Sequence, residues 1–213
     1  MTSNMGLLLT LTEPPPAMQE EFNAWYDSEH MGERLSIPGF LSARRWERDC
    51  APGEGRYLAT YELNSPGVLE SPGYLAHVGD HQSPWSKRCL GRTVVFRRWA
   101  CEQIVPGNRS PDEKATAVFL ACGDVPAAHE EEFNRWYDIE HLPLLLQVPG
   151  VLSARRFRAS SGSPRYVALY DLANENVPQH PAWQSAIRTE WAGRIHALTA
   201  DCEWILGTWR EYR

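Results

Sequence analysis

The chain has 213 residues, enough for one large domain or two small ones, and should bury roughly 70% of its unfolded surface. Hydrophobic residues make up 43% and charged residues 23%, which excludes a wholly disordered chain, collagen or a long coiled coil. The formal net charge of -6 has the wrong sign for a nucleic-acid surface, and the first apolar run, residues 6–11, is too short to span a membrane. We therefore expect a cytoplasmic protein with neither nucleic acid nor membrane as a partner.

The first half of the chain predicts the element order β-α-β-β-α-β. Residues 7–11 form an apolar strand, and the prolines at 14–16 separate it from a helix that begins near Ala17. The apolar stripe of this helix consists of Met18, Phe22, Trp25 and Tyr26, with Glu29 on the same face. Strands follow over residues 41–48 and 56–63, a less regular helix lies within 74–90, and a last strand covers 93–102.

The second half repeats the first. Residues 20–46 are identical to residues 131–157 at 17 of 27 positions, an offset of 111, and residues 56–63 match 165–172 at an offset of 109. Strands are expected near 115–122, 151–158, 165–171 and 202–209, with helices near 127–146 and 181–196. Because residues 105–112 are rich in turn formers, we expect a linker at 105–114 between repeats at 1–104 and 115–213.

This element order predicts an α+β fold made of two ferredoxin-like βαββαβ repeats. One face of each four-stranded antiparallel sheet is covered by helices, and the other face needs a partner. With two copies in one chain, the sheets can pack face to face as an intramolecular barrel with the helices outside.

The repeated motifs resemble those of a known superfamily. The run Phe-Asn-x-Trp-Tyr-Asp-x-Glu-His at 22–30 and 133–141, followed by Pro-Gly-x-Leu-Ser-Ala-Arg-Arg at 38–45 and 149–156, resembles the dimeric α/β-barrel superfamily, particularly its EthD-like branch, as a tandem duplication. The resemblance covers nearly the whole chain and implies the fold. It does not imply one reaction, because that superfamily includes cofactor-free monooxygenases, cyclases, isomerases, decarboxylating enzymes and haem-binding branches.

The repeated helix carries the candidate catalytic residues. His30 lies four residues after Tyr26 and three after Asp27, so on an α-helix the carboxylate can orient the imidazole beside a phenol. An imidazole can change its charge near neutral pH. The second copy supplies His141, Tyr137 and Asp138. The structural alternative is that the histidine interacts with the C-terminal end of the helix and that the aromatic residues fill the core.

Acidic and basic residues of the motif form a second candidate set. Glu29 and Glu140 sit on apolar stripes, where a carboxylate needs a partner. We expect Glu29 to pair with Arg44 or Arg45, and Glu140 with Arg155 or Arg156. The functional alternative is that Arg44 or Arg155 binds an anionic group of the substrate. Trp25 and Trp136 are expected to wall a dry pocket.

Three functions remain open. The first is a cofactor-free lyase, isomerase or cyclase that uses general acid–base catalysis on a flat, aromatic small molecule. The second is an oxidative enzyme on the same scaffold, either haem-dependent or a cofactor-free monooxygenase. The third is a non-catalytic ligand-binding or stress protein. No metal site is predicted, and the chain is expected to be a monomer with an intramolecular barrel or a homodimer.

Overall fold

The two repeats form one closed barrel of eight antiparallel strands. The computed structural model describes residues 4–212. Around the barrel the strand order is β1-β3-β2-β8-β5-β7-β6-β4, and β4 pairs with β1 to close it. The strands are β1 (Gly6–Glu13), β2 (Phe40–Glu47), β3 (Tyr57–Leu63), β4 (Val95–Val105), β5 (Ala117–Gly123), β6 (Val151–Ser161), β7 (Tyr166–Leu172) and β8 (Trp204–Glu211). The predicted fold class is confirmed.

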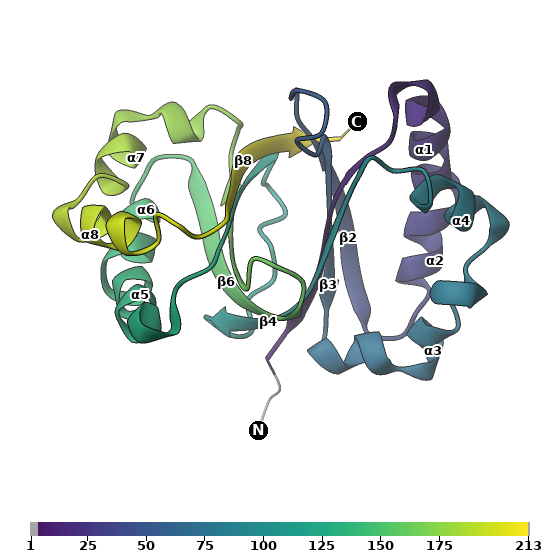
Figure 1. Cartoon of the computed structure of the whole chain (residues 1–213), viewed down its shortest axis with the longest axis horizontal. Coiled ribbons are helices and arrows are strands. Elements are labelled where there is room, and N and C mark those ends of the chain that lie inside the picture. Colours follow the sequence, from purple (N-terminus) through teal and green to yellow (C-terminus); the bar gives the residue numbers. More distant parts are fainter. Residues whose placement is uncertain (1–3, 213) are drawn as a thin grey trace.

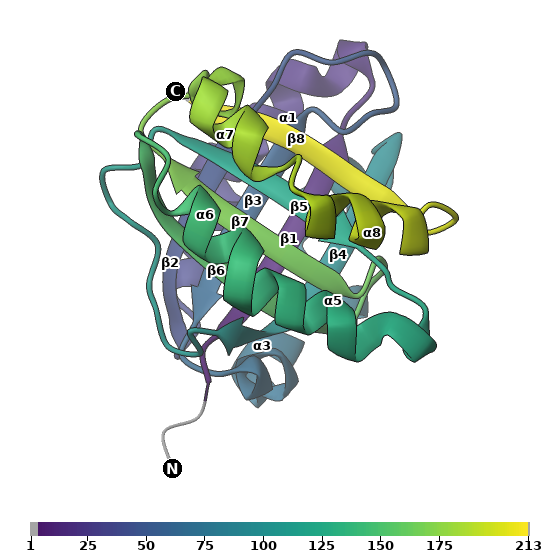
Figure 2. The same ribbon diagram turned by 90° about the vertical axis from the view of Figure 1, so that its left-hand side faces the viewer.

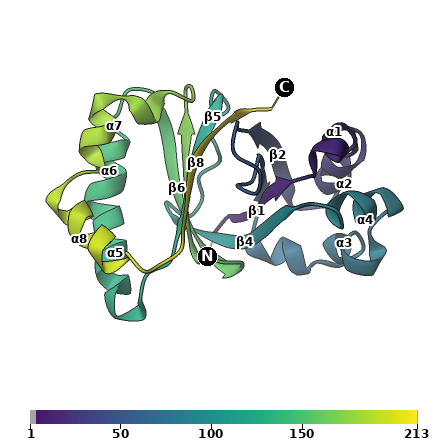
Figure 3. The ribbon, with the colours of Figure 1, turned by 45° about the horizontal axis from the view of Figure 1, so that its top comes forward.

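Each repeat contributes a four-stranded sheet, and the sheets join at two seams. At one seam β2 pairs with β8 through Trp46–Glu211 and Glu47–Arg210. At the other, β4 pairs with β6 over a longer register that runs from Ala100–Ser161 to Val105–Arg156. The helices of the two repeats cover opposite outer faces of the barrel (Figures 1 and 3). The second seam is the longer one because β4 and β6 are the longest strands, with 11 residues each.

The first helix of each repeat is interrupted by one π-helical turn. In the first repeat, α1 (Gln19–Trp25) continues through a π turn at Tyr26–His30 into α2 (Met31–Leu35). In the second, α5 (Glu130–Trp136) continues through Tyr137–His141 into α6 (Leu142–Leu145). The remaining helices, more broken than the sequence predicts, are α3 (Pro72–Leu75), α4 (Pro84–Leu90), α7 (Pro181–Ala186) and α8 (Glu190–Leu198).

Alternation along the strands divides the apolar residues into three cores. Inward-facing side chains fill the barrel, among them Trp46, Trp99, Phe157 and Trp209. Outward-facing side chains form one core under the helices of each repeat, around Phe22 and Trp25 in the first and around Phe133 and Trp136 in the second. Because the barrel interior is packed with side chains, a ligand site is to be sought between a sheet and its helices.

No helix among residues 4–212 is both long enough and apolar enough to cross a membrane.

Candidate functional site

A pocket of about 410 Å³ lies between the sheet and the helices of the second repeat. Its floor comes from β5, β7 and β8, and its walls come from α5 to α8, which lie in front of that sheet in Figure 2. The lining is mostly apolar and consists of Phe119, Ala121, Trp136, Tyr137, Leu145, Tyr170, Trp183, Ile187, Ala200, Trp204 and Leu206, together with His141, His196 and Thr199. Such a cavity, apolar with a few convergent polar groups, suits a flat organic ligand.

The π turn sets the position of the pocket histidine. In the second repeat the Leu142 N–H donates to the Tyr137 carbonyl, five residues back, and the first repeat has the same bond from Met31 to Tyr26. Five residues of α-helix advance about 500°, which would leave residues i and i+5 roughly 140° apart. The wider turn instead stacks His141 on Trp136, with ring centroids 4.2 Å apart. Turns of this kind occur often at functional sites.

His141 is a neutral imidazole at physiological pH. Burial, followed by the nearby charges of His196 and Arg156, lowers its pKa from 6.5 to about 3. Its Nδ1 is buried and has no hydrogen-bond partner among residues 4–212, and the ring lines the pocket. The prediction that this imidazole changes charge near neutral pH is therefore wrong, and the same holds for His30, whose pKa is also lowered to about 3.

Two phenols of the pocket stay protonated. Burial raises the pKa of Tyr137 to about 12. Burial also raises the pKa of Tyr170 well above its usual range, and the neighbouring Tyr137 adds to that effect. Both hydroxyls therefore keep their proton at neutral pH, and the hydroxyl oxygen of Tyr170 is itself buried. Tyr170 was not among the candidates from the sequence, although the repeated segment 165–172 contains it. His196, Trp183 and Trp204 were not among them because they lie outside the matching motifs.

The predicted aspartates do not orient the histidines. Arg45 donates to Asp27 at 2.7 Å and to Asn23 at 2.5 Å, and its guanidinium lies 4.4 Å from the centre of the Tyr26 ring. The second repeat builds the same clamp from Arg156, Asp138 and Asn134. The expectation that Asp27 or Asp138 orients an imidazole is wrong, because the π turn directs the histidine to the tryptophan while the carboxylate meets arginine. The clamp ties the helix to the sheet.

The predicted partners of the glutamates are also wrong. Glu29 accepts a hydrogen bond from the Ser83 hydroxyl at 2.5 Å, and Ser83 caps the N-terminus of α4. Glu140 accepts from Thr189, the N-cap of α8, at 2.5 Å and from the Trp136 indole at 3.2 Å. Each glutamate therefore links the two helices of its own repeat, and neither pairs with an arginine among residues 4–212.

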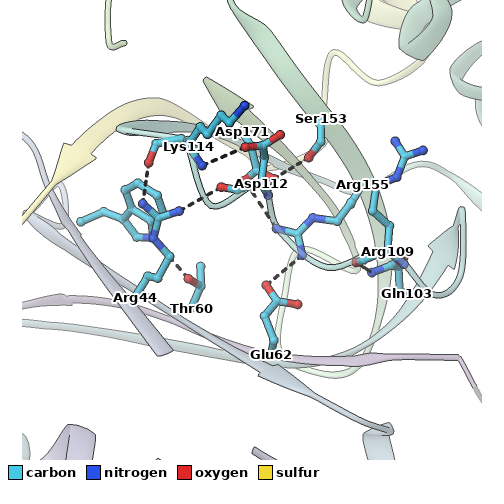
Figure 4. Close-up of polar contacts among 12 residues, drawn as sticks. Arg44, Thr60, Glu62, Gln103, Arg109, Asp112, Lys114, Ser153, Arg155 and Asp171 are labelled. Atoms are coloured by element: carbon cyan, nitrogen blue, oxygen red, sulfur yellow. Dashed lines mark hydrogen bonds and ion pairs between the residues drawn. The ribbon is translucent and has the colours of Figure 1, made fainter. Parts of the chain in front are cut away.

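Arg44 and Arg155 face the other side of the sheet. Arg155 donates to Glu62 at 2.8 Å and lies 3.5 Å from Asp171, with all three side chains buried at one end of the barrel (Figure 4). Arg44 reaches the same end and donates to Glu211 and to the backbone carbonyls of Asp112 and Ala115. Neither guanidinium lines the pocket of the second repeat.

The corresponding space in the first repeat is filled. Trp25, Tyr26, His30 and Tyr61 repeat the aromatic frame, and His30 stacks on Trp25 at 4.3 Å. Arg34 stands where the second repeat has Leu145, and Phe40 stands where it has Val151. The Phe40 ring lies 6.0 Å from both Tyr61 and Tyr74. The larger side chains therefore occupy the region that is an open pocket in the second repeat.

Haem fits this pocket poorly. His141 and His196 could each offer an imidazole, but within the described part of the chain no arginine or lysine lines the pocket. The two propionates of haem are anionic and would have no cationic partner on these walls. The walls suit an uncharged ring better than a dianionic macrocycle.

Solved structures show the same architecture. A candidate monooxygenase from Lactobacillus acidophilus NCFM matches with a TM-score of 0.60 at 12% identity, over 98% of this chain and 94% of that one. An anthrone oxidase-like protein matches with a TM-score of 0.63 at 14% identity, over 99% and 92%. A mutant chlorite dismutase from Candidatus Nitrospira defluvii gives 0.61 at 8% identity, over 98% and 92%. No protein-family model and no curated protein matches the chain.

Proposed function

The chain has the dimeric α/β-barrel fold, closed within one polypeptide, and we propose that it is a small-molecule enzyme whose active site is the pocket of the second repeat. The substrate is a flat aromatic molecule with a keto or hydroxyl oxygen, and the reaction begins with the transfer of a proton. The observation that carries this proposal is the aromatic cavity in which one buried, neutral imidazole and one exposed imidazole meet two protonated phenols.

The two histidines take different roles in this proposal. A group with a pKa of about 3 cannot hold the proton it removes at neutral pH, so His141 acts as a neutral hydrogen-bonding partner. His196 lies on the exposed side of α8 and lines the pocket, so it can take a proton from the substrate and release it to solvent. Tyr137, which remains protonated, supplies a donor for the oxygen on which negative charge develops.

A second candidate is oxidation of the same substrate by dioxygen. It is favoured by two structural relatives, the anthrone oxidase-like protein and the candidate monooxygenase. Removal of a proton from an aromatic ketone such as anthrone gives an electron-rich anion that dioxygen can oxidise without a bound cofactor. The overall balance is anthrone plus dioxygen to anthraquinone plus water. The first step is the same proton transfer, so the two candidates share a substrate class and differ in the fate of the anion.

Anthrone and 2-naphthol are suitable probes for the experiment. Binding is followed by calorimetry, proton transfer by deuterium exchange at the acidic CH₂ of anthrone under nitrogen, and oxidation by dioxygen uptake in air. We expect His196→Gln to slow the exchange about 100-fold, as for loss of a general base. His81→Gln, at an exposed histidine of the first repeat, is the matched control and should leave the exchange unchanged.

The outcomes separate the candidates. Exchange without dioxygen uptake supports the non-oxidative enzyme, whereas exchange with uptake supports the oxidase. If neither probe binds, or if His196→Gln and His81→Gln exchange at equal rates, this pocket is not the proposed site of proton transfer.

A further inference from the structure

A second cavity, of about 360 Å³, is lined by residues of both repeats and of the segment that joins them. Strands β2 and β3 contribute Ser42, Arg44 and Glu62, β8 contributes Glu211, and the joining segment contributes residues between 110 and 113. The cavity lies on the barrel side of the sheet, whereas the pocket of the second repeat lies between the sheet and the helices. An inference drawn from it therefore stands whether or not that pocket is catalytic.

Glu62 forms the floor of this cavity. It is 3% exposed, whereas the other lining residues are half-buried or exposed. Its Oε1 accepts a hydrogen bond from Arg155 at 2.8 Å, and only this oxygen meets the guanidinium in Figure 4. Its Oε2 is buried and has no hydrogen-bond partner in the part of the chain that the structure describes. A buried polar atom of this kind calls for a water molecule or a ligand.

The buried charges around Glu62 do not balance. Arg155 serves two buried carboxylates, because it also lies 3.5 Å from Asp171. All three side chains are at most 3% exposed, so one negative charge is in excess. Burial raises the pKa of Glu62, and Arg155 offsets this effect only in part. A second positive charge beside the free oxygen would therefore stabilise the carboxylate.

The equivalent carboxylate of the second repeat is fully partnered. Asp171 occupies the position of Glu62, and its Oδ2 accepts hydrogen bonds from the Ser153 hydroxyl and the Asp112 N–H. Ser42 is the counterpart of Ser153, but it lines the cavity and makes no hydrogen bond to Glu62 within the described chain. The unpartnered oxygen therefore belongs to the first repeat alone and is not a feature of the shared fold.

The walls of the cavity leave acceptors free, and their donor is already occupied. The Arg44 guanidinium donates to the Glu211 carboxylate at 2.8 Å and to the backbone carbonyls of Asp112 and Ala115. Its positive charge is therefore neutralised by Glu211. Glu113 adds an exposed carboxylate at the rim. Such a cavity suits a ligand that carries a positive charge and N–H donors.

We propose that this cavity binds the ammonium group of a small aliphatic amine, with Glu62 Oε2 as its buried acceptor and the Ser42 hydroxyl as a second one. The alkyl chain packs on Leu41 and Pro111, the apolar residues of the lining. An ammonium group supplies donors and one positive charge, whereas a water molecule supplies donors alone. A metal ion is a poorer match, because residues 4–212 hold no cluster of three or more histidine, cysteine or acidic side chains suited to one.

The probe is n-butylammonium, which keeps its proton at pH 8 as a lysine side chain does. Tetramethylammonium carries the same charge without an N–H donor and serves as the matched ion. Calorimetry on the whole chain at constant ionic strength measures the binding of each. We expect saturable binding of butylammonium, at least about 10-fold tighter than that of tetramethylammonium. Crystals grown with butylammonium should show its nitrogen within hydrogen-bond distance of Glu62 Oε2.

Variants assign the binding to the cavity. Glu62→Gln keeps the volume and leaves Arg155 paired with Asp171, so it should fold and lose butylammonium binding. Glu70→Gln, the same change at an exposed glutamate of the first repeat, should keep it. Should Glu62→Gln fail to fold, Glu113→Gln at the rim should weaken binding about 3-fold.

Three results would overturn the proposal. The first is equal binding of butylammonium and tetramethylammonium by the wild-type chain. The second is wild-type binding of butylammonium by Glu62→Gln. The third is a crystal grown with butylammonium in which only a water molecule occupies the space beside Glu62 Oε2, bridging it to Nε of Arg155, a second buried atom without a partner in the described chain.

Discussion

At the scale of the residue, each repeat carries one histidine that is held neutral inside the protein. His30 and His141 are buried beneath aromatic rings, and burial is the largest cause of their lowered pKa values of about 3. Their position was predictable from the repeated motif. Their chemistry was not, because a helical wheel based on regular α-helix places the histidine beside the aspartate. The π turn that moves it beside the tryptophan leaves no recognisable sign in the residue types.

This protonation state makes stability depend on pH. The folded-state pKa of about 3 lies below the ordinary value of 6.5 for both imidazoles, so between these pH values the unfolded chain binds protons that the folded chain does not. The free energy of unfolding therefore falls as the pH falls from 6.5, by at most about 1.4 kcal/mol per pH unit for each histidine. Well above pH 6.5, where the unfolded chain is also deprotonated at these positions, neither histidine contributes to the pH dependence.

We expect His30→Gln and His141→Gln, each made alone, to flatten the dependence of the unfolding free energy on pH between 7 and 5. Urea unfolding at a series of pH values measures the slope. His81→Gln removes an exposed histidine and should leave that slope unchanged. Equal slopes in all four proteins would mean that the buried imidazoles titrate normally.

At the scale of the element, the glutamate of each motif joins the two helical segments of its own repeat. Thr189 caps α8, accepting from the Ala192 N–H, and donates to Glu140. Ser83 does the same between α4 and Glu29. The sequence indicated that each glutamate needed a partner. It could not indicate the cap, because Ser83 and Thr189 lie outside the motif and reach it only after the second helical region folds back.

Loss of the cap should therefore loosen the wall of the pocket. We expect Thr189→Ala to lower the free energy of unfolding by about 1 kcal/mol, because the N-cap hydrogen bond is lost and Glu140 loses a donor. Ser83→Ala should cost a similar amount. Only Thr189→Ala should also weaken ligand binding in the second repeat, and calorimetry with the probe molecules tests this difference. If both variants bind the probe molecules equally well, the packing of α8 against Glu140 does not support the pocket.

At the scale of the whole molecule, the duplication is symmetric in its backbone and asymmetric in its chemistry. The repeated element order and the two sheets that each need a partner were sufficient to predict the closed barrel. The differences that make one helix layer hollow and the other polar lie in single replacements, such as Arg34 against Leu145 and Thr10 against Ala121. Such replacements are visible in the aligned repeats, but their effect depends on packing that the sequence alone does not give.

The same asymmetry appears inside the barrel, where equivalent arginines have different surroundings. Arg155 is fully enclosed and bridges Glu62 of the first repeat to Asp171 of the second, whereas its counterpart Arg44 stacks on Trp46 at 4.2 Å near the barrel mouth and is 19% exposed (Figure 4). Arg155 therefore ties the two repeats together from within. Loss of Arg155 would destabilise the fold mainly because two buried carboxylates, Glu62 and Asp171, would lose their counter-ion.

We expect Arg155→Met to lower the free energy of unfolding by about 3–5 kcal/mol, and Arg44→Met, the matched change, to cost no more than about 1 kcal/mol. The double variant Arg155→Met, Glu62→Leu should recover much of the loss, because Asp171 keeps the hydrogen bonds from the Ser153 hydroxyl and the Asp112 N–H. Urea unfolding measures all three. If Arg155→Met and Arg44→Met cost the same, or if the double variant is less stable than Arg155→Met, the buried ion pair is not what joins the repeats, and the apolar barrel core alone holds them.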